Sequence, residues 1–197
     1  MACMYRAAAI VSGLWLLFSP ALAGAAGKPA AVDAARLSAA DREAGDWMSY
    51  GRTYGEQRFS PLSKVNENNI DRLGLAWQFK YDLDRVVEAT PIVVDGVLYT
   101  TGAYSMVCAL DATNGKLLWK YAPEVYRRIQ GSGCCDAANR GVAVWKGRVY
   151  VGVYDGRLVA LDARTGRKAW SVDTVIDHER NYTITGAPRV VKGKAII

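Results

Sequence analysis

The feature that most constrains the fold of this chain is an internal repeat. Residues 93–100 read Val-Val-Asp-Gly-Val-Leu-Tyr-Thr, and similar stretches return at residues 144–151 and 190–197. A second element, which begins Ala-Leu-Asp and ends in Trp, covers residues 109–119 and returns at residues 160–170. A period of this length indicates repeated structural units, each of which buries its apolar face against the next unit.

Each repeated unit has the pattern of four short strands. In the first complete unit, the turn signals Asp95-Gly96 and Asn114-Gly115 separate short apolar runs. We therefore expect strands at residues 92–94, 97–101, 106–110 and 116–121. Four strands in each unit, with periodic Gly and Trp, are typical of a β-propeller blade. The sequence predicts an all-β fold, in which Trp119, Trp170 and the earlier Trp77 pack between adjacent sheets.

The chain divides into three parts. Residues 1–23 have the form of a secretory signal peptide, with Arg6, an apolar stretch and the small-residue site Ala21-Leu22-Ala23. The apolar stretch is too short for a typical membrane span, and an uncleaved anchor is the alternative. Residues 24–45 form an N-terminal lead segment with the composition of short helical turns. Residues 46–197 are expected to form a partial propeller: a lead-in with a short helix at residues 66–73, about two blades, and the start of a third.

Charge and histidine content exclude several classes of function. The formal net charge is +6, but Lys and Arg are dispersed and do not form the basic stripe of a nucleic-acid-binding protein. His178 is the only histidine, which excludes a zinc site with several histidine ligands. Its neighbours Asp177 and Glu179 indicate an exposed loop, so a hydrolase triad is disfavoured.

Two adjacent cysteines, Cys134 and Cys135, stand in a glycine-rich stretch. Consecutive Cα atoms lie about 3.8 Å apart, below the usual disulfide range of roughly 4.4–6.8 Å. A disulfide between them would close a small strained ring, of the kind that surrounding structure holds at ligand sites. Spacing alone equally allows two free thiols. Export to an oxidising compartment would let such a disulfide persist, with Cys108 left as a buried, unpaired side chain.

Three polar residues occupy matched positions in successive units. Glu88, Arg140 and Thr185 each lie four or five residues before the shared hairpin. Equivalent positions in a propeller are related by its pseudo-symmetry axis. If the hairpins contain the innermost strands, these side chains meet at one mouth of the central channel. Each alone reads as a surface charge or a turn residue, but together they indicate a common pocket, with Cys134 and Cys135 just upstream of Arg140.

Four stretches together carry a resemblance to a known family. They are residues 47–77, the repeated Ala-Leu-Asp element, residues 133–141 with Gly-Cys-Cys-Asp and Asn-Arg-Gly, and residues 182–188 (Tyr-Thr-Ile-Thr-Gly-Ala-Pro). From about residue 46 to residue 197 the chain resembles the N-terminal part of a quinoprotein alcohol dehydrogenase, a family that uses pyrroloquinoline quinone (PQQ). The resemblance implies an eight-bladed propeller when the protein is complete, so we expect this sequence to be a part of one.

The resemblance also implies roles for individual residues. Cys134 and Cys135 would form a vicinal disulfide against one face of the quinone. Arg140 would reach the reactive quinone oxygens and act in catalysis, and Glu88 and Thr185 would make polar contacts to the cofactor. A calcium or lanthanide ion is implied as well, with its ligands expected beyond Ile197 and no metal ligand within this stretch.

The activity implied is oxidation of primary alcohols to aldehydes in the periplasm by hydride transfer to the quinone. Electrons would pass to cytochrome c or to a fused haem domain, and a homo-oligomer is compatible with the sequence. The alternative is a non-catalytic propeller scaffold, such as an outer-membrane assembly protein. That alternative predicts a lipid-attachment cysteine after the signal peptide and no adjacent cysteine pair, and the sequence shows the reverse.

Overall fold

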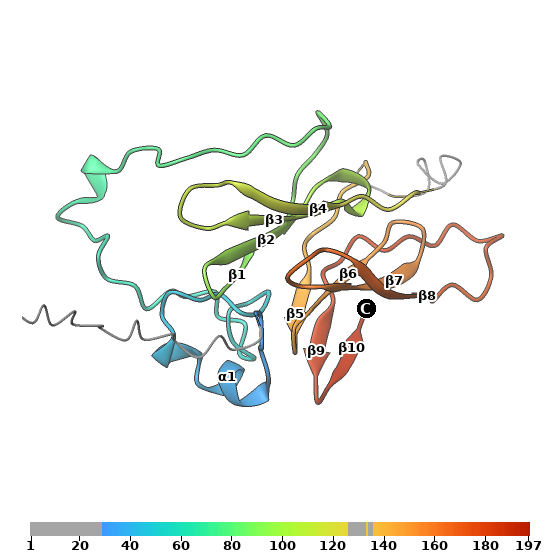
Figure 1. Ribbon diagram of the computed structural model, residues 1–197, viewed down its shortest axis with the longest axis horizontal. Helices are drawn as coiled ribbons and strands as arrows, with labels where there is room; N and C mark the ends of the chain where they lie inside the picture. The colour runs from blue at the N-terminus through green and yellow to red at the C-terminus, as the bar shows by residue number, and fades with distance from the viewer. Residues whose placement is uncertain (1–28, 126–132, 134–135) are drawn as a thin grey trace, which may run out of the picture.

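The computed structural model describes residues 29–125, 133 and 136–197, which form three antiparallel sheets (Figure 1). The first sheet has the order β1-β2-β3-β4, the second β5-β6-β7-β8, and the third contains β9 and β10. The strands are β1 (Ile92–Val94), β2 (Val97–Thr101), β3 (Val107–Asp111), β4 (Leu117–Tyr121), β5 (Ala143–Trp145), β6 (Arg148–Gly152), β7 (Arg157–Asp162), β8 (Lys168–Asp173), β9 (Arg189–Val191) and β10 (Lys194–Ile196). The expected two blades and the start of a third are confirmed, and the expected strands of the first unit agree to within one residue at each end.

The repeated hairpin turns explain why strand pairs form at the same place in each unit. Asp95 and Gly96 both have positive φ angles, 52° and 77°, and join β1 to β2. The equivalent pairs Lys146-Gly147 and Lys192-Gly193 have the same combination of positive φ angles. Two consecutive left-handed residues are the geometry of a tight turn whose twist matches that of the flanking strands. This local geometry fixes the register of every first hairpin.

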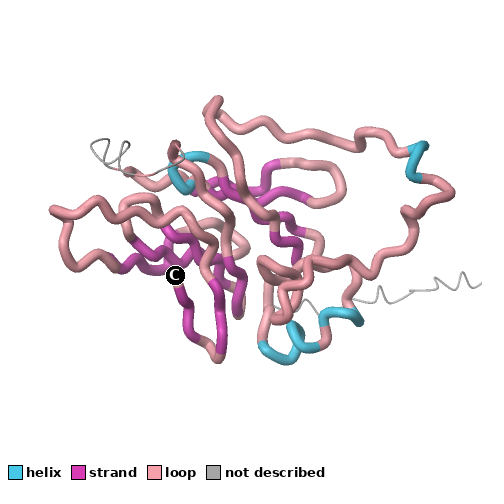
Figure 2. The backbone as a smooth tube through the Cα atoms, turned by 180° about the vertical axis from the view of Figure 1, so that it is seen from behind, coloured by secondary structure: helices cyan, strands magenta, loops and turns pink. Residues whose placement is uncertain are grey.

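The first strands of the three sheets lie close together, and the later strands extend away from them (Figures 1 and 2). The segments that precede these strands are hydrogen-bonded to one another: Thr90 N–H donates to the Arg140 carbonyl, and Arg140 N–H donates to the Thr185 carbonyl. This is the arrangement of propeller blades around a common axis, with β1, β5 and β9 innermost. We call residues 88–91, 139–142 and 185–188 the pre-strand segments.

Trp119 and Trp77 pack as the repeat predicts, whereas Trp170, the third tryptophan of the prediction, is 42% exposed in β8. The ring of Trp119, at the end of the first unit, lies over Gly166 in the β7–β8 turn, where a Cβ atom would come within 2.5 Å of it. Its indole N–H donates to the Ala163 carbonyl at 3.0 Å. Trp77 lies over Gly115 in the β3–β4 turn in the same way, again at 2.5 Å. Glycine is therefore required at both turns by the positive φ and by the aromatic ring above it.

The larger of two apolar clusters fills the space between the first two sheets and the N-terminal segment. Each fully buried aliphatic side chain in such a core contributes about 1.5–3 kcal/mol. Its largest fully buried members are Tyr99, Met48, Ile92, Leu161, Val32, Val94, Val107, Val142, Val149 and Val151. A smaller cluster, Met106, Cys108 and Leu110, packs with Trp77, Phe79, Tyr81 and Leu98 on the other face of the first sheet.

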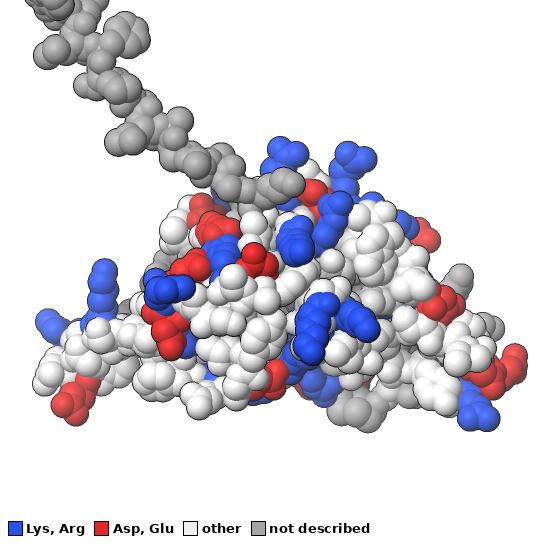
Figure 3. Space-filling model, turned by 90° about the horizontal axis from the view of Figure 1, so that it is seen from below, with Lys and Arg blue, Asp and Glu red and all other residues white. Residues whose placement is uncertain are grey.

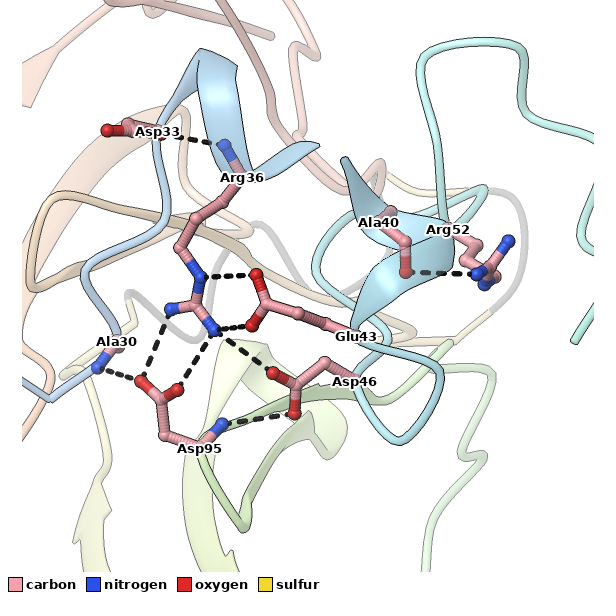
Figure 4. Close-up of polar contacts among 8 residues, drawn as sticks. All are labelled: Ala30, Asp33, Arg36, Ala40, Glu43, Asp46, Arg52 and Asp95. Atoms are coloured by element: carbon pink, nitrogen blue, oxygen red, sulfur yellow. Dashed lines mark hydrogen bonds and ion pairs between the residues drawn. The ribbon is translucent and has the colours of Figure 1, made fainter. Parts of the chain in front are cut away.

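The N-terminal segment folds into α1 (Ala34–Ser38) and a 3-10 turn (Ala40–Arg42), which confirms the expected short helical turns. Asp33 caps α1, because its carboxylate accepts from Arg36 N–H at 2.8 Å. The guanidinium of Arg36 contacts Glu43, Asp46 and Asp95, the last of which stands in the β1–β2 turn (Figure 4). The hydrogen bond from Arg36 lowers the pKa of Glu43, whereas burial raises that of Asp46.

The same segment also binds the second sheet. Lys146 N–H donates to the Val32 carbonyl at 2.8 Å, and Gly147 N–H donates to the Ala30 carbonyl at 2.9 Å. The segment therefore joins the turns of the first two blades at the end of the sheets away from the pre-strand segments. Lys and Arg side chains are mixed with Asp and Glu over this end of the molecule (Figure 3), in agreement with the dispersed charge of the sequence.

The helix expected at residues 66–73 is wrong except for one 3-10 turn, Ile70–Arg72. The cause is local: the Asn69 carboxamide accepts from Asn66 N–H and donates to the Lys64 carbonyl. Asn66 in turn accepts from Asn68 N–H. Asparagine side chains that bond the nearby backbone compete with helical hydrogen bonds. Within the described part of the chain, no helix combines the length and the apolar character that a membrane crossing needs.

Candidate functional site

The three pre-strand segments place Glu88, Arg140 and Thr185 together. The backbone of Arg140 is held on both sides, since its N–H donates to the Thr185 carbonyl at 2.9 Å and its carbonyl accepts from Thr90 N–H at 3.2 Å. Three successive blades are thereby joined at one residue. The convergence expected from the register of the repeat is present in the structure.

The side chain of Arg140 joins the other two polar groups. Its Nη2 lies 2.9 Å from Glu88 Oε2, and its Nη1 donates to Thr185 Oγ1 at 2.7 Å. The side chains of Arg140 and Glu88 are each about one-third exposed, at 34% and 33%. The guanidinium is therefore held by partners from both neighbouring blades and still faces solvent at the mouth. A role for these residues in binding a cofactor stays a prediction.

The segment that carries Arg140 is packed tightly against its neighbours. Gly141 has φ +126°, and a Cβ atom there would lie 2.9 Å from the Thr90 carbonyl oxygen. Only glycine fits at this position without moving the adjacent blade. Upstream, Asp136 pairs with Arg85 at 3.2 Å. This segment therefore contacts the chain that leads into β1 at both of its ends.

The predicted site residues Cys134 and Cys135 lie outside the described residues, as does the expected signal peptide at residues 1–23. The residue before the cysteines is described. A Cβ atom on Gly133 would lie 2.2 Å from Tyr154 Oη, so a larger residue would displace this buried tyrosine. Tyr154 also meets the ring of Tyr104 edge-on, with ring centroids 6.5 Å apart. Gly133 thus lies against the turn between β6 and β7.

Other candidate chemistry lies away from this mouth. Among the described residues, one acidic group has oxygens close enough for a metal ion, namely Glu43, Asp46 and Asp95. The Arg36 guanidinium contacts all three carboxylates, so this cluster is an ion-pair network (Figure 4). His178 is exposed and pairs with Asp173 at 2.7 Å, as the interpretation of an exposed loop predicted.

Sequence reasoning missed the buried polar residues that hold the segment carrying Arg140. Thr101, Ser105 and Asn139 are all buried; Thr101 donates to the Asn139 carbonyl, and the Asn139 amide donates to Ser105. Asn139 belongs to the motif around Arg140, and its place beside that arginine is the signal that the sequence offers. Ser105 and Tyr104 have left-handed backbone angles, φ 60° and 56°, which nothing in their residue types indicates.

Comparison with known proteins decides the family. A family model described as "PQQ: Glucose/ethanol/alcohol dehydrogenase, beta-propeller domain" matches residues 47–197. The chain belongs to this family. The match covers the blades, the cysteine motif and all three residues that meet at the mouth.

Individual relatives and solved structures support the same family. Quinohemoprotein alcohol dehydrogenase ADH-IIG of Pseudomonas putida is 62% identical, over 98% of this chain and 26% of the relative. The solved structure of quinohemoprotein alcohol dehydrogenase ADHIIG from Pseudomonas putida HK5 superposes with a TM-score of 0.84 at 66% identity, over 86% of this chain and 25% of that one. A europium-containing methanol dehydrogenase superposes with a TM-score of 0.76 at 36% identity, over 82% and 28%. The chain spans about a quarter of the length of these proteins.

Membership of the family also establishes the predicted all-β fold of the quinoprotein dehydrogenase type. The four-stranded sheets and the packing of tryptophan over glycine in this chain are therefore parts of that propeller.

The residues at the mouth fit the cofactor in the family description. A guanidinium offers a planar fork of N–H donors, and a hydroxyl adds a further donor, which together suit carbonyl and carboxylate oxygens on a flat ring. Arg140 and Thr185 provide these two groups from adjacent blades, 2.7 Å apart. The partial exposure of Arg140 leaves its face toward the mouth available to a ligand.

Proposed function

We propose that the complete protein is a PQQ-dependent alcohol dehydrogenase of the periplasm that oxidises primary alcohols to aldehydes. One observation carries the proposal: Arg140, Glu88 and Thr185 from three successive blades converge at one mouth of a propeller of this family. The location rests on the sequence of residues 1–23, which has the form of a signal peptide.

Arg140 would bind and polarise the cofactor. When bound, PQQ supplies an electrophilic quinone carbonyl that can accept a hydride. The Arg140 guanidinium would donate hydrogen bonds to the quinone oxygens, where negative charge develops. A cation held in place beforehand stabilises that charge without reorganising during the reaction, and the bonds to Glu88 and Thr185 hold it in this way.

Glu88 and Thr185 would complete the polar edge of the cofactor site. The Thr185 hydroxyl, which now accepts from Arg140, can rotate to donate to a ligand oxygen. The Glu88 carboxylate balances the arginine charge at 2.9 Å and fixes one side of the guanidinium. Cys134 and Cys135 would present a vicinal disulfide to one face of the ring. A flat, rigid surface of this kind suits a planar cofactor.

Further components belong to the complete protein. A calcium or lanthanide ion would assist Arg140, with ligands from residues after Ile197. The acceptor of the electrons would be cytochrome c or a fused haem domain. The relative from Pseudomonas putida is named a quinohemoprotein, and the similar methanol dehydrogenase contains europium, which supports both assignments for this family.

The proposal is tested by alcohol-dependent reduction of a dye with the complete protein loaded with PQQ. We expect activity with primary alcohols in the wild type. Arg140→Lys should lower kcat/KM about 100-fold or more, because a single ammonium cannot replace the fork of donors at the developing charge. Arg148→Lys is the matched control, since Arg148 also pairs with a carboxylate, Asp162 at 3.2 Å, but lies in β6. Equal activity of Arg140→Lys and wild type would refute the assignment.

A further inference from the structure

A buried polar cluster supports the segment that carries Arg140. Thr101, Ser105 and Asn139 are each at most 1% exposed. Asn139 Nδ2 donates to Ser105 Oγ at 3.1 Å and to the Gly152 carbonyl at 2.9 Å. Its Oδ1 accepts from Gly141 N–H at 3.0 Å, and its backbone carbonyl accepts from Thr101 Oγ1 at 3.1 Å.

The Asn139 amide joins three parts of the fold. Ser105 ends the 3-10 turn Ala103–Ser105 that connects β2 and β3 in the first sheet. Gly152 ends β6 in the second sheet, and Gly141 belongs to the same pre-strand segment as Asn139. Ser105 Oγ also accepts from Tyr154 N–H at 3.0 Å. One side chain thus binds two neighbouring blades and the segment between them.

Only a carboxamide satisfies all of these contacts. The site requires two donors, for Ser105 Oγ and the Gly152 carbonyl, and one acceptor, for Gly141 N–H. An aspartate would place a carboxylate oxygen against the Gly152 carbonyl. An apolar residue would leave buried polar groups without partners, which is costly in a dry interior.

These contacts lie on both sides of Arg140. Its preceding residue supplies the amide, and its following residue donates to that amide, so one side chain closes a ring around the arginine peptide. Arg140 N–H and its carbonyl are held by Thr185 and Thr90. The backbone of Arg140 is thereby held on both sides, which fixes the point from which its side chain extends to Glu88 and Thr185.

We propose that Asn139 is a positioning residue, which acts through Arg140 and sets the orientation of the guanidinium toward the cofactor. This inference rests on the proposed function, because the quinone is the ligand that Arg140 would bind. Asn139 itself, at 1% exposure, touches no ligand.

The test is a double-mutant cycle on PQQ affinity, measured by quenching of tryptophan fluorescence in the complete apo-protein. The four proteins are wild type, Asn139→Ala, Arg140→Lys and the double variant. In the wild-type background, Arg140→Lys should weaken PQQ binding about tenfold. In the Asn139→Ala background it should weaken binding less than about threefold, because the guanidinium is then no longer held in the orientation that binds the cofactor. Asn114→Ala, at an exposed amide in the β3–β4 turn, is the control and should leave affinity and the effect of Arg140→Lys unchanged.

A purely structural role would give a different pattern. It would lower the melting temperature of the apo-protein but leave the loss from Arg140→Lys the same in both backgrounds, which would overturn the inference. If Asn139→Ala does not fold, Thr101→Val removes only the hydroxyl that donates to the Asn139 carbonyl, and the same cycle applies. Wild-type protein that does not bind PQQ would overturn the proposed function itself, whereas binding with additive losses would overturn only the role of Asn139.

Discussion

Arg140 contacts the neighbouring blades through both its backbone and its side chain, which explains its central place in the candidate site. Its backbone joins the pre-strand segments of three blades, and its guanidinium bridges Glu88 and Thr185. The register of the repeat predicted this meeting point, because equivalent positions in successive blades must face the same axis. Ser105 could not be predicted, because the residue types do not indicate the left-handed turn at Tyr104 and Ser105 that brings it to Asn139.

At the same scale, the cysteine pair makes a testable prediction. Replacing both Cys134 and Cys135 with serine in the complete protein should abolish most alcohol-dependent dye reduction, because the vicinal disulfide proposed to lie against the quinone would be lost. The melting temperature of the apo-protein should not change, since the described blades are held by strand pairing and an apolar core. Mass spectrometry of the unreduced peptide spanning residues 131–140 tests the linkage directly.

Cys108 provides the internal control for this prediction. Burial raises the pKa of its thiol to about 11, so it should resist alkylation in the folded protein at neutral pH. The interpretation fails if Cys134 and Cys135 alkylate readily in the native oxidised enzyme and the double serine variant keeps full activity.

At the scale of the elements, most of the fold follows from short sequence signals. The pairs Asp95-Gly96, Lys146-Gly147 and Lys192-Gly193 form the expected turns. Both residues of each pair have positive φ angles, which glycine adopts readily. Trp119 and Trp77 pack on turn glycines because each repeat places an aromatic residue opposite a position without a Cβ atom. The helix prediction for residues 66–73 is wrong because asparagine side chains hydrogen-bond the local backbone, and a helix assignment from composition does not take such bonds into account.

The turns between the outer strands give a prediction about pH. The hydroxyl of Thr113 donates to Asp111, and that of Thr165 donates to Asp162, and these bonds lower the pKa of both carboxyl groups. A carboxyl group whose pKa is lower in the folded state stabilises the protein above its unfolded pKa, which is about 3.9. That contribution is lost as the pH falls through the folded pKa.

Asp162→Asn should therefore lower the melting temperature at pH 7, and the difference from wild type should shrink at pH 3, which lies below the unfolded pKa of about 3.9 and toward the lowered pKa of the folded state. Thermal melts monitored by circular dichroism at both pH values provide the measurement. Asp71→Asn, in the exposed turn Ile70–Arg72, serves as the matched control. A difference between wild type and Asp162→Asn that is equal at pH 7 and pH 3 would contradict the argument from the lowered pKa.

At the scale of the whole molecule, the N-terminal segment has a clear structural task. Through Arg36 it binds the β1–β2 turn, and through the carbonyls of Ala30 and Val32 it binds the β5–β6 turn. These contacts tie the blades together at the end away from Arg140. The sequence did not reveal them, because Arg36 and Asp95 are 59 residues apart and no local pattern relates an ion pair over such a distance.

The proposed active site and the N-terminal segment lie at opposite ends of the sheets. Loops and pre-strand segments at one end hold Arg140, while the hairpin turns and the N-terminal segment close the other end. Functional residues on segments positioned by a rigid scaffold are the usual arrangement in proteins of this kind. Chemistry can then vary at the mouth without disturbing the packing of the sheets.

The most direct test of the central claim is a structure of the complete protein with PQQ bound. The proposal predicts that the Arg140 guanidinium lies within about 2.7–3.2 Å of a quinone oxygen, with Glu88 and Thr185 at the same edge of the ring. It also predicts that Cys134 and Cys135 lie against one ring face. A quinone bound elsewhere, or one bound at this mouth without contact to Arg140, would contradict the account.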